Sequence, residues 1–563
     1  MPASPVFQRL PLHIAERIAH YYIHTIVEDK HYTKEYECET SVWSILYNVS
    51  YSWRTLALQF FFQEVTIEIL TETGKGQFKY ACLPDEIKLD AVHHKYVKRV
   101  NIDFPDFAKP PTKTSLQDFS SAWPRYLAFP SAIILYIDMR GLLYQLFDEN
   151  NSAKSERFYW ISQRIKTAMP KLQEVTLNDI GIERMRGKWP YDTKWKAEEF
   201  LWVCFDKLTA FDIRLTAANL ICDYSLIQNG TGLTRLQCQC SSTNNFISSV
   251  IMKSAPTLES LVFDDQTLKN MESLVFDDMR KPVVYPKLQK LELYSLNNAT
   301  FDVKLQVDKS VVLFPALRFL RWHTLYIFED DALFRGNEDT LEYLDIQIDL
   351  DFVHALRRHE VFSNGRHSRL YYVAVGVLSN SNKVTLSRDV FMMFAVDLIA
   401  PNTKYLFLGG YYLFNDNIRV VSASPYFGNL QILNLANAQF TLHELLELVK
   451  LLPNMTKLRC APRDIDTKLD TPQFSEFINK LYSEFYPLSH CFRYWIAPLD
   501  LHYQHDYLAP CALVFAILCP NFVLATTPPA FRNEYGRKIQ DAIDCGLYVD
   551  HIDKIQRLLR IMG

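Results

Sequence analysis

The chain has 563 residues, a net charge of −4 at pH 7, 48% hydrophobic residues and 22% charged residues. These proportions are typical of folded globular proteins and exclude a chain that is disordered throughout. The sequence has no run of basic residues, and phosphate binding requires concentrated lysine and arginine. We therefore expect no nucleic-acid partner.

The 11 cysteines show no CxxC spacing. We expect free and mostly buried thiols in a reducing compartment, and therefore a cytoplasmic or nuclear protein. The N-terminus has no apolar segment of the secretory type. The longest apolar run, Ala512–Cys519, is too short to span a bilayer, so no membrane association is expected.

The first 70 residues predict two or three short helices. Ile14 and Ile18 recur at helical spacing, and apolar residues do the same between Leu46 and Phe60. Pro11 stands where a helix can begin.

This segment resembles an F-box, a short helical module that docks on the Skp1 adaptor of cullin–RING ubiquitin ligases. The motif is LPxxIxxxI followed by V-S-x-x-W-R-x-L-A, and the matching residues are Leu10, Pro11, Ile14, Ile18, Val49, Ser50, Trp53, Arg54, Leu56 and Ala57. The resemblance implies that the adaptor would be bound by Leu10, Pro11, Ile14, Ile18, Val49, Trp53 and Leu56.

Two features depart from the F-box pattern. The linker Glu28–Ser41 is longer than in a compact F-box, and the acidic–leucine pair that usually opens the second helix is missing. The alternative is that these helices only cap the N-terminal end of the domain that follows.

Strand-like segments begin after the helices. VTIEIL at Val65, YVKRVNIDF at Tyr96 and AIILYIDM at Ala132 alternate apolar and polar residues. We expect them to be the first and atypical members of a series of repeats, because terminal repeats usually depart from the consensus.

The pattern apolar–x–x–apolar–x–apolar then returns about every 24–30 residues, as LESLVF at Leu258, LQKLEL at Leu288, LRFLRW at Leu317 and LEYLDI at Leu341. Alternate side chains of a strand point to opposite faces, so Leu344 and Ile346 share one face while Tyr343 and Asp345 share the other. One such strand cannot bury its apolar face alone, so the copies must stack into a parallel sheet with a crossover between strands.

The same spacing extends in both directions. Further copies begin at or near Leu172, Leu208, Leu233, Leu370, Lys404, Leu430 and Met455. Proline stands two residues before the first apolar position in several copies, where it can end a helix before a strand. These prolines are Pro170, Pro256, Pro286, Pro315, Pro401 and Pro453.

This arrangement resembles leucine-rich repeat proteins of the long β-α type, clearly over about residues 165–465 and weakly over about 95–495. The family often has asparagine or cysteine three positions after the last strand leucine, where this chain has Leu296 and Ala438. The expected fold is an α/β leucine-rich repeat solenoid, a curved parallel sheet with outer helices, behind a small all-α F-box-like module. This order is most similar to that of the large fungal families of F-box-like repeat proteins.

An internal echo interrupts the series. ESLVFDD occurs at Glu259–Asp265 and again at Glu272–Asp278. The offset of about 13 residues is too short for a strand, a helix and their loops. We assign the first copy to the ladder of strands and the second to the return segment.

The C-terminal part predicts a cap. CFRYWIAPLDLHY at Cys491 is a candidate last strand, and Arg537–Met562 is an amphipathic helix with Ile539, Ile543, Ile552, Ile555 and Leu559 at helical spacing. A solenoid needs its last apolar edge covered. The alternative for this helix is a partner-binding surface. The expected domains are therefore 1–70, 90–495 and 496–563.

No catalytic constellation is found. TGKGQ at Thr73–Gln77 lacks the first glycine and the Ser/Thr of a phosphate loop, and GxSxG and HExxH are absent. We expect no enzymatic activity, no metal and no cofactor.

The residues expected to face a partner follow from the strand alternation, and aromatic residues and arginine are the types favoured as interface anchors. They are Val262, Glu292, Phe319, Arg321, Tyr343, Asp345, Tyr405, Phe407 and Asn434. The alternative is that irregular loops cover some of these aromatic side chains.

The expected function is substrate recognition in an SCF-type cullin–RING ubiquitin ligase. The N-terminal helices would bind the Skp1 adaptor, and the repeat arc would bind a protein substrate. The alternative is a non-catalytic repeat scaffold without a ligase role.

Overall fold

The structure is a computed structural model of the whole chain. It describes residues 17, 51–69, 76–80, 91–103, 128–138, 165–178, 194–195, 208–215, 219–220, 232–240, 245–264, 272–277, 279–294, 304–323, 327–328, 331–348, 353–354, 356–357, 360–362, 366–377, 396–409, 424–462, 471–496, 505–524 and 529–562.

The chain divides into two units, unit 1 (Met1–Leu274) and unit 2 (Val275–Gly563). The core of unit 1 is a ladder of parallel strands, each paired with the next. The strands are β1 (Glu64–Ile69), β3 (Arg99–Asp103), β4 (Ile134–Asp138), β5 (Glu174–Asn178), β7 (Ala210–Leu215), β9 (Arg235–Cys240) and β10 (Ser260–Asp264). A further strand, β2 (Gly76–Tyr80), pairs antiparallel with β1 and was not expected from the sequence.

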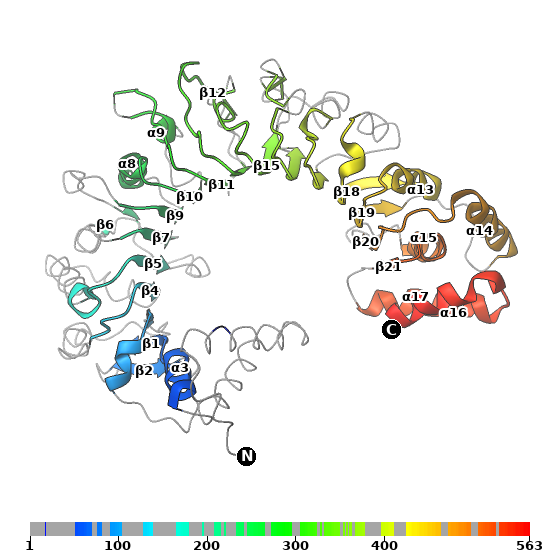
Figure 1. The fold of residues 1–563 in the computed structure, drawn as a ribbon, viewed down its shortest axis with the longest axis horizontal. Helices are drawn as coiled ribbons and strands as arrows, with labels where there is room; N and C mark the ends of the chain where they lie inside the picture. Colours follow the sequence, from blue (N-terminus) through cyan, green and yellow to red (C-terminus); the bar gives the residue numbers. More distant parts are fainter. Residues whose placement is uncertain are drawn as a thin grey trace. The chain divides into compact units, whose positions relative to one another are not determined.

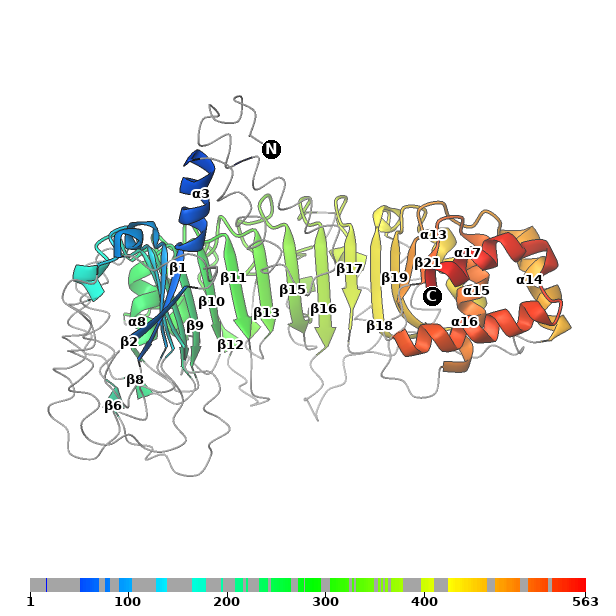
Figure 2. The same cartoon turned by 90° about the horizontal axis from the view of Figure 1, so that it is seen from below.

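Unit 2 is built on a second parallel ladder, whose upright strands Figure 2 shows side by side. Its strands are β11 (Lys290–Tyr294), β13 (Phe319–His323), β15 (Tyr343–Ile348), β16 (Tyr372–Val377), β17 (Tyr405–Leu408), β18 (Ile432–Phe440), β19 (Lys457–Pro462), β20 (Tyr494–Ile496) and β21 (Val523–Leu524). The pairing is parallel throughout these strands, as the repeat pattern predicts.

The burial of the strands alternates as the sequence requires. In β15, Leu344 and Ile346 are fully buried, whereas Tyr343 and Asp345 on the other face are half-buried. Each leucine sits beside the equivalent apolar residue of the next strand, for example Leu320 beside Leu344. This continuous stack excludes water and accounts for the stability of the ladder. Both units therefore have the architecture of a leucine-rich repeat solenoid.

Helices return the chain between several strands. They include α8 (Asn245–Ser254), which buries Val250 and Ile251, and α13 (Leu442–Leu451), which begins at a capping box formed by Thr441 and Glu444. Shorter elements are the strand pairs β6 (Lys194–Trp195) with β8 (Asn219–Leu220) and β12 (Lys304–Leu305) with β14 (Ile327–Phe328), and the 3-10 turns η2 (Ala91–Tyr96), η8 (Phe427–Asn429) and η9 (Val549–His551).

The six prolines that precede the repeats all lie in turns before their strands, as expected. In the turns before the strands, with or without a proline, side chains donate hydrogen bonds to the backbone of the preceding repeat. Thr340 donates to the carbonyl of Leu317 (2.8 Å), and Asn429 donates to the carbonyl of Pro401 (3.0 Å). Thr257, Thr403, Thr456 and Asn454 make equivalent bonds. Inter-repeat side-chain bonding thus occurs at the starts of the strands.

The two copies of the ESLVFDD segment adopt the structures that were predicted for them. Its first copy forms β10, while its second begins with the short helix α9 (Glu272–Val275) and continues to an isolated bridge between Phe276 and Pro282. The same letters adopt different structures because only the first copy lies in register with β9.

The C-terminal end differs in two respects from the sequence-based expectation. β20 is not the last strand, because β21 pairs with it and continues the ladder. The expected helix over Arg537–Met562 is interrupted, since Gly546 and Tyr548 adopt positive φ angles of 81° and 63°. This left-handed backbone ends a helix.

Four helices gather at this end of unit 2 in Figure 1: α14 (Pro472–Phe485), α15 (His505–Leu518), α16 (Pro529–Asp544) and α17 (Ile552–Met562). α15 contacts β19, and α17 contacts β21. From Leu508 to Leu518, α15 is buried, as expected for a helix that is apolar on all sides. These contacts cover the last strands with apolar side chains.

Within the described residues, none of the helices is both long enough and apolar enough to cross a membrane.

The buried His367 provides a test of the packing in unit 2. Its ring lies 4.9 Å from the ring of Phe362 and 6.2 Å from that of Phe334, and burial lowers its pKa from 6.5 to about 4. Below pH 6.5 the unfolded chain binds a proton that the folded chain does not accept until about pH 4. This group therefore stabilises the fold above its unfolded pKa, and its contribution is lost as the pH falls.

We predict that between pH 7 and pH 4 the free energy of unfolding falls more in the wild type than in His367→Leu, by about 3 kcal/mol. Urea denaturation at several pH values measures this difference. Other groups titrate equally in both proteins, so a difference that stays constant with pH would contradict the prediction.

Candidate functional site

The candidate site lies on the open face of unit 2, which is the face of the sheet opposite the buried leucines. Because the strands pair in parallel and in register, equivalent residues form rows across the sheet. The first row contains Lys290, Phe319, Tyr343, Tyr372, Tyr405, Ile432, Lys457 and Tyr494. The second row contains Glu292, Arg321, Asp345, Ala374, Phe407, Asn434, Arg459 and Ile496.

Four rings of the first row form a continuous stack, here called the aromatic row: Phe319, Tyr343, Tyr372 and Tyr405. Consecutive ring centroids are 3.9, 4.0 and 4.1 Å apart, and consecutive ring planes are within 9° of parallel. Neighbouring strands are about 4.8 Å apart, so the rings lean towards one another. All four side chains are half-buried, so the row remains in part accessible to a partner.

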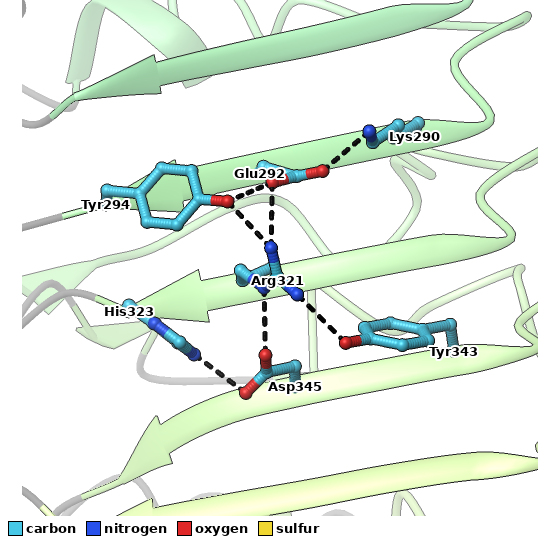
Figure 3. A network of polar contacts seen from close by, with 7 residues as sticks. All are labelled: Lys290, Glu292, Tyr294, Arg321, His323, Tyr343 and Asp345. Carbon is cyan, nitrogen blue, oxygen red and sulfur yellow. Dashed lines mark hydrogen bonds and ion pairs between the residues drawn. The ribbon is translucent and has the colours of Figure 1, made fainter. Parts of the chain in front are cut away.

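Arg321 is the centre of a polar network beside this row, shown in Figure 3. Its Nε donates to Asp345 Oδ2 (2.8 Å), and its Nη1 donates to Glu292 Oε2 (3.1 Å) and Tyr294 Oη (2.7 Å). Its Nη2 donates to Tyr343 Oη (2.9 Å). One guanidinium thus bridges three strands, because β11, β13 and β15 are neighbours.

The outer members of the network complete the neutralisation of the two carboxylates. Lys290 Nζ lies 2.7 Å from Glu292 Oε1, and Tyr294 donates its hydroxyl proton to the other oxygen of Glu292. His323 Nε2 lies 2.7 Å from Asp345 Oδ1. With one arginine, one lysine and two carboxylates, the network is neutral when His323 is uncharged.

The network also shifts the pKa values of its two carboxylates. Burial alone would raise the pKa of Asp345, but the hydrogen bonds and charges of His323 and Arg321 outweigh burial and lower it. The pKa of Glu292 is lowered for the same reason by Lys290, Tyr294 and Arg321. Both carboxylates therefore stay ionised at neutral pH and hold the guanidinium in place.

Arg321 also contacts the neighbouring aromatic rings. Its guanidinium carbon is 5.6 Å from the centroid of Phe319 and 5.8 Å from those of Tyr294 and Tyr343. These distances allow cation–π attraction. The aromatic row and the polar network are thus one connected surface with side chains fixed in position.

The structure brings most of the predicted partner-facing residues together. Glu292, Arg321, Tyr343 and Asp345 belong to the network, and Phe319 and Tyr343 are half of the aromatic row. Tyr405, Phe407 and Asn434 continue the same face on β17 and β18. Glu292 is only 6% exposed, so it supports Arg321 rather than offering a free carboxylate. Val262 is half-buried on β10 in unit 1 and is not part of this group.

Sequence reasoning missed three members of the surface: Tyr372, Tyr294 and His323. Tyr372 precedes the buried Val373, as Tyr343 precedes Leu344, so aligning the repeats on their buried residues would have found it. Tyr294 and His323 are the last residues of β11 and β13, two positions after Glu292 and Arg321. Strand alternation places them on the open face as well.

The predicted adaptor-binding residues are only partly described. Leu10, Pro11, Ile14, Ile18 and Val49 lie outside the described residues. Trp53 and Leu56 lie on α3 (Tyr51–Phe61) and are 4% and 3% exposed. Their side chains pack inside this chain, and α3 contacts η2.

No protein-family model matches the sequence, and the comparison with curated proteins gives no match. Solved structures to which the chain is similar include one from the yeast Rad7–Elc1 complex, with 15% identity, coverage of 71% of this chain and 76% of that chain, and a TM-score of 0.29. Another is an internalin, InlF, from Listeria monocytogenes (12% identity, 75% and 88% coverage, TM-score 0.29). A third belongs to the mouse RP105/MD-1 complex (12% identity, 68% and 62% coverage, TM-score 0.34). These values are too low to transfer a function, and the fold assignment rests on the strand register itself.

Removal of the central guanidinium tests the network. We predict that Arg321→Met lowers the free energy of unfolding by about 2–4 kcal/mol, because Glu292 and Asp345 would stay largely buried without their shared cation. Urea denaturation at pH 7 measures this loss.

Arg318→Met is the matched control, since Arg318 is exposed and directly precedes β13, and its loss should change stability by about 0.5 kcal/mol or less. Equal effects of the two substitutions would show that the network contributes nothing particular to the fold.

Proposed function

We propose that this chain binds a protein on the open face of unit 2 and acts as the substrate-recognition subunit of an SCF-type cullin–RING ubiquitin ligase. The observation that carries the binding role is the aromatic row held against the Arg321 network. Tyrosine and arginine are the residue types most enriched among energetic anchors of protein interfaces. Repeat solenoids commonly use such extended open sheets for binding.

The fixed geometry of the surface favours binding of a macromolecule. The stacked rings and the Arg321 guanidinium, with its four hydrogen bonds, have already lost their rotamer freedom in the free chain. A partner would therefore order few side chains on association, which lowers the entropic cost of binding. The balanced charges of β11–β15 favour a folded protein or peptide over a polyanion there.

The ligase role rests on the F-box-like motif around Pro11 and Trp53. Trp53 and Leu56 are buried, so we assign them to the internal packing of the module and assign adaptor contact to the first part of the motif, from Leu10 to Ile18. The chain would supply proximity between ligase and substrate, with no catalysis, metal or cofactor of its own. Such a subunit would act in the cytoplasm or nucleus.

The second candidate is a repeat scaffold without a ligase role. It is favoured by one observation: α3 buries its apolar motif residues Trp53, Leu56 and Ala57 and contacts η2, as a helix that merely caps the N-terminal repeats would do.

Adaptor binding separates these candidates. We predict that the purified full chain captures recombinant Skp1, and that Pro11→Ala with Ile14→Ala lowers this capture at least about tenfold, because an apolar helix–helix interface depends on a few anchors. A pull-down quantified at physiological salt measures it.

Pro5→Ala, which lies outside the motif, serves as the control, and thermal melting checks that each variant folds. We avoid Trp53→Ala because truncating a buried tryptophan costs about 3–5 kcal/mol of stability. A wild-type chain that fails to capture Skp1 would favour the scaffold.

The aromatic row gives an independent test of partner binding. In the source cell, proximity labelling with the wild-type chain should mark a set of proteins that Tyr372→Ala with Tyr405→Ala loses, by on the order of tenfold, because the stack is broken. Labelling of Skp1 should be unchanged.

Tyr371→Ala is the matched control, since Tyr371 is 47% exposed and lies just outside the row. If the double variant labels the same proteins as the wild type, the open face of unit 2 is not the binding surface.

A further inference from the structure

The charge of the open face changes along unit 2. On β11–β15, Arg321 and Lys290 are balanced by Glu292 and Asp345. The strands from β17 to β21 contain no Asp or Glu, whereas β19 carries Lys457 and Arg459. This end of the face is therefore cationic among the residues that the structure describes.

Arg459 differs from Arg321 although both occupy the second row. Arg321 donates to four oxygen atoms, but in the described part of the chain the guanidinium of Arg459 has no acceptor. Its Nε is shielded from water and lacks a hydrogen-bond partner. An unpaired donor on a charged group is costly, because it has lost water without gaining an acceptor.

A second unsatisfied atom lies on the neighbouring strand. Asn434 pairs in register with Arg459, and its Oδ1 is also shielded and without a hydrogen-bond partner. The Nδ2 of Asn434 donates to Tyr405 Oη (3.4 Å), which is the last ring of the aromatic row. One unpaired donor, Arg459 Nε, and one unpaired acceptor, Asn434 Oδ1, thus belong to residues paired across neighbouring strands, where the aromatic row ends.

The unpaired groups of Arg459 and Asn434 define which kind of ligand could bind them. A guanidinium binds carboxylate or phosphoryl oxygens in a bidentate manner, and an amide oxygen accepts a hydrogen bond from a backbone N–H. An extended peptide carries both groups, an acidic side chain and an N–H donor. Apolar contacts are available beside them from Phe407, Ile432 and Ile496, which occupy the same two rows.

We infer that the protein bound by this face presents an acidic segment to β17–β20, with an anionic side chain on Arg459 and Lys457. The inference rests on the proposed protein-binding function and specifies its partner. The anion is a carboxylate or a phosphoryl group, since both satisfy a guanidinium. The partner is drawn to this end by the cationic charge and is held along the aromatic row.

The test is selection from a display library of random 15-residue peptides on the immobilised full chain at about 150 mM salt. We expect the recovered pool to be enriched in Asp and Glu. Synthetic peptides from this pool should bind Arg459→Ala roughly tenfold more weakly than the wild type, as expected for loss of a charge-assisted hydrogen bond. Lys480→Ala, on the exposed side of α14, is the control and should bind normally.

Replacing the glutamates of a recovered peptide by phosphoserine distinguishes the two anions, because tighter binding indicates a phosphoryl ligand and weaker binding indicates a carboxylate. Recovery of neutral or basic peptides that still depend on Tyr372 and Tyr405 would overturn the inference and leave the proposed function standing. Equal binding by Arg459→Ala would also overturn it. Failure to enrich any peptide would count against both.

Discussion

Parallel, in-register pairing of successive strands is the constraint on which the rest of this structure depends. Each strand binds its neighbour through the backbone, and each buried leucine stacks on the equivalent residue of the next repeat, as Leu320 does on Leu344. A shift of one residue would turn every leucine outward. The register is therefore set by burial, and it determines at the same time which residues share a row on the open face.

This constraint explains why like residues meet. Phe319, Tyr343, Tyr372 and Tyr405 stack because they occupy one position in four consecutive strands. In the next row, alternation of charge sets Arg321 between Glu292 and Asp345, so that opposite charges face each other across neighbouring strands. Cross-strand pairs of this kind stabilise a sheet, whereas like charges in these places would destabilise it. Further along the same row, the neighbours of Arg459 are Asn434 and Ile496 in place of acids, and that difference marks a place for an external anion.

The ends of the ladder follow a different rule. The C-terminal strands are covered by α15 and α17, and a helix as uniformly apolar as α15 is stable only when surrounded. Sequence periodicity recognised the amphipathic segment there but not its interruption at Gly546. The spacing of hydrophobic residues does not show where the backbone adopts a positive φ angle, as it does at Gly546. The two-residue strand β21 was missed because it is too short to show alternation.

The sequence by itself determined the ladder: the spacing of its leucines and the prolines before them predicted the positions of the parallel strands, and it predicted that Tyr343, Arg321 and Asp345 would face outward. These are local properties, since burial alternates every second residue. Only the tertiary structure decided which outward residues touch, because contact across the strands of unit 2 depends on the register between segments 24–37 residues apart. It joined Tyr372 to the aromatic row and buried Glu292 beside Arg321. Among the described residues, it also left Arg459 Nε and Asn434 Oδ1, on neighbouring strands, without hydrogen-bond partners.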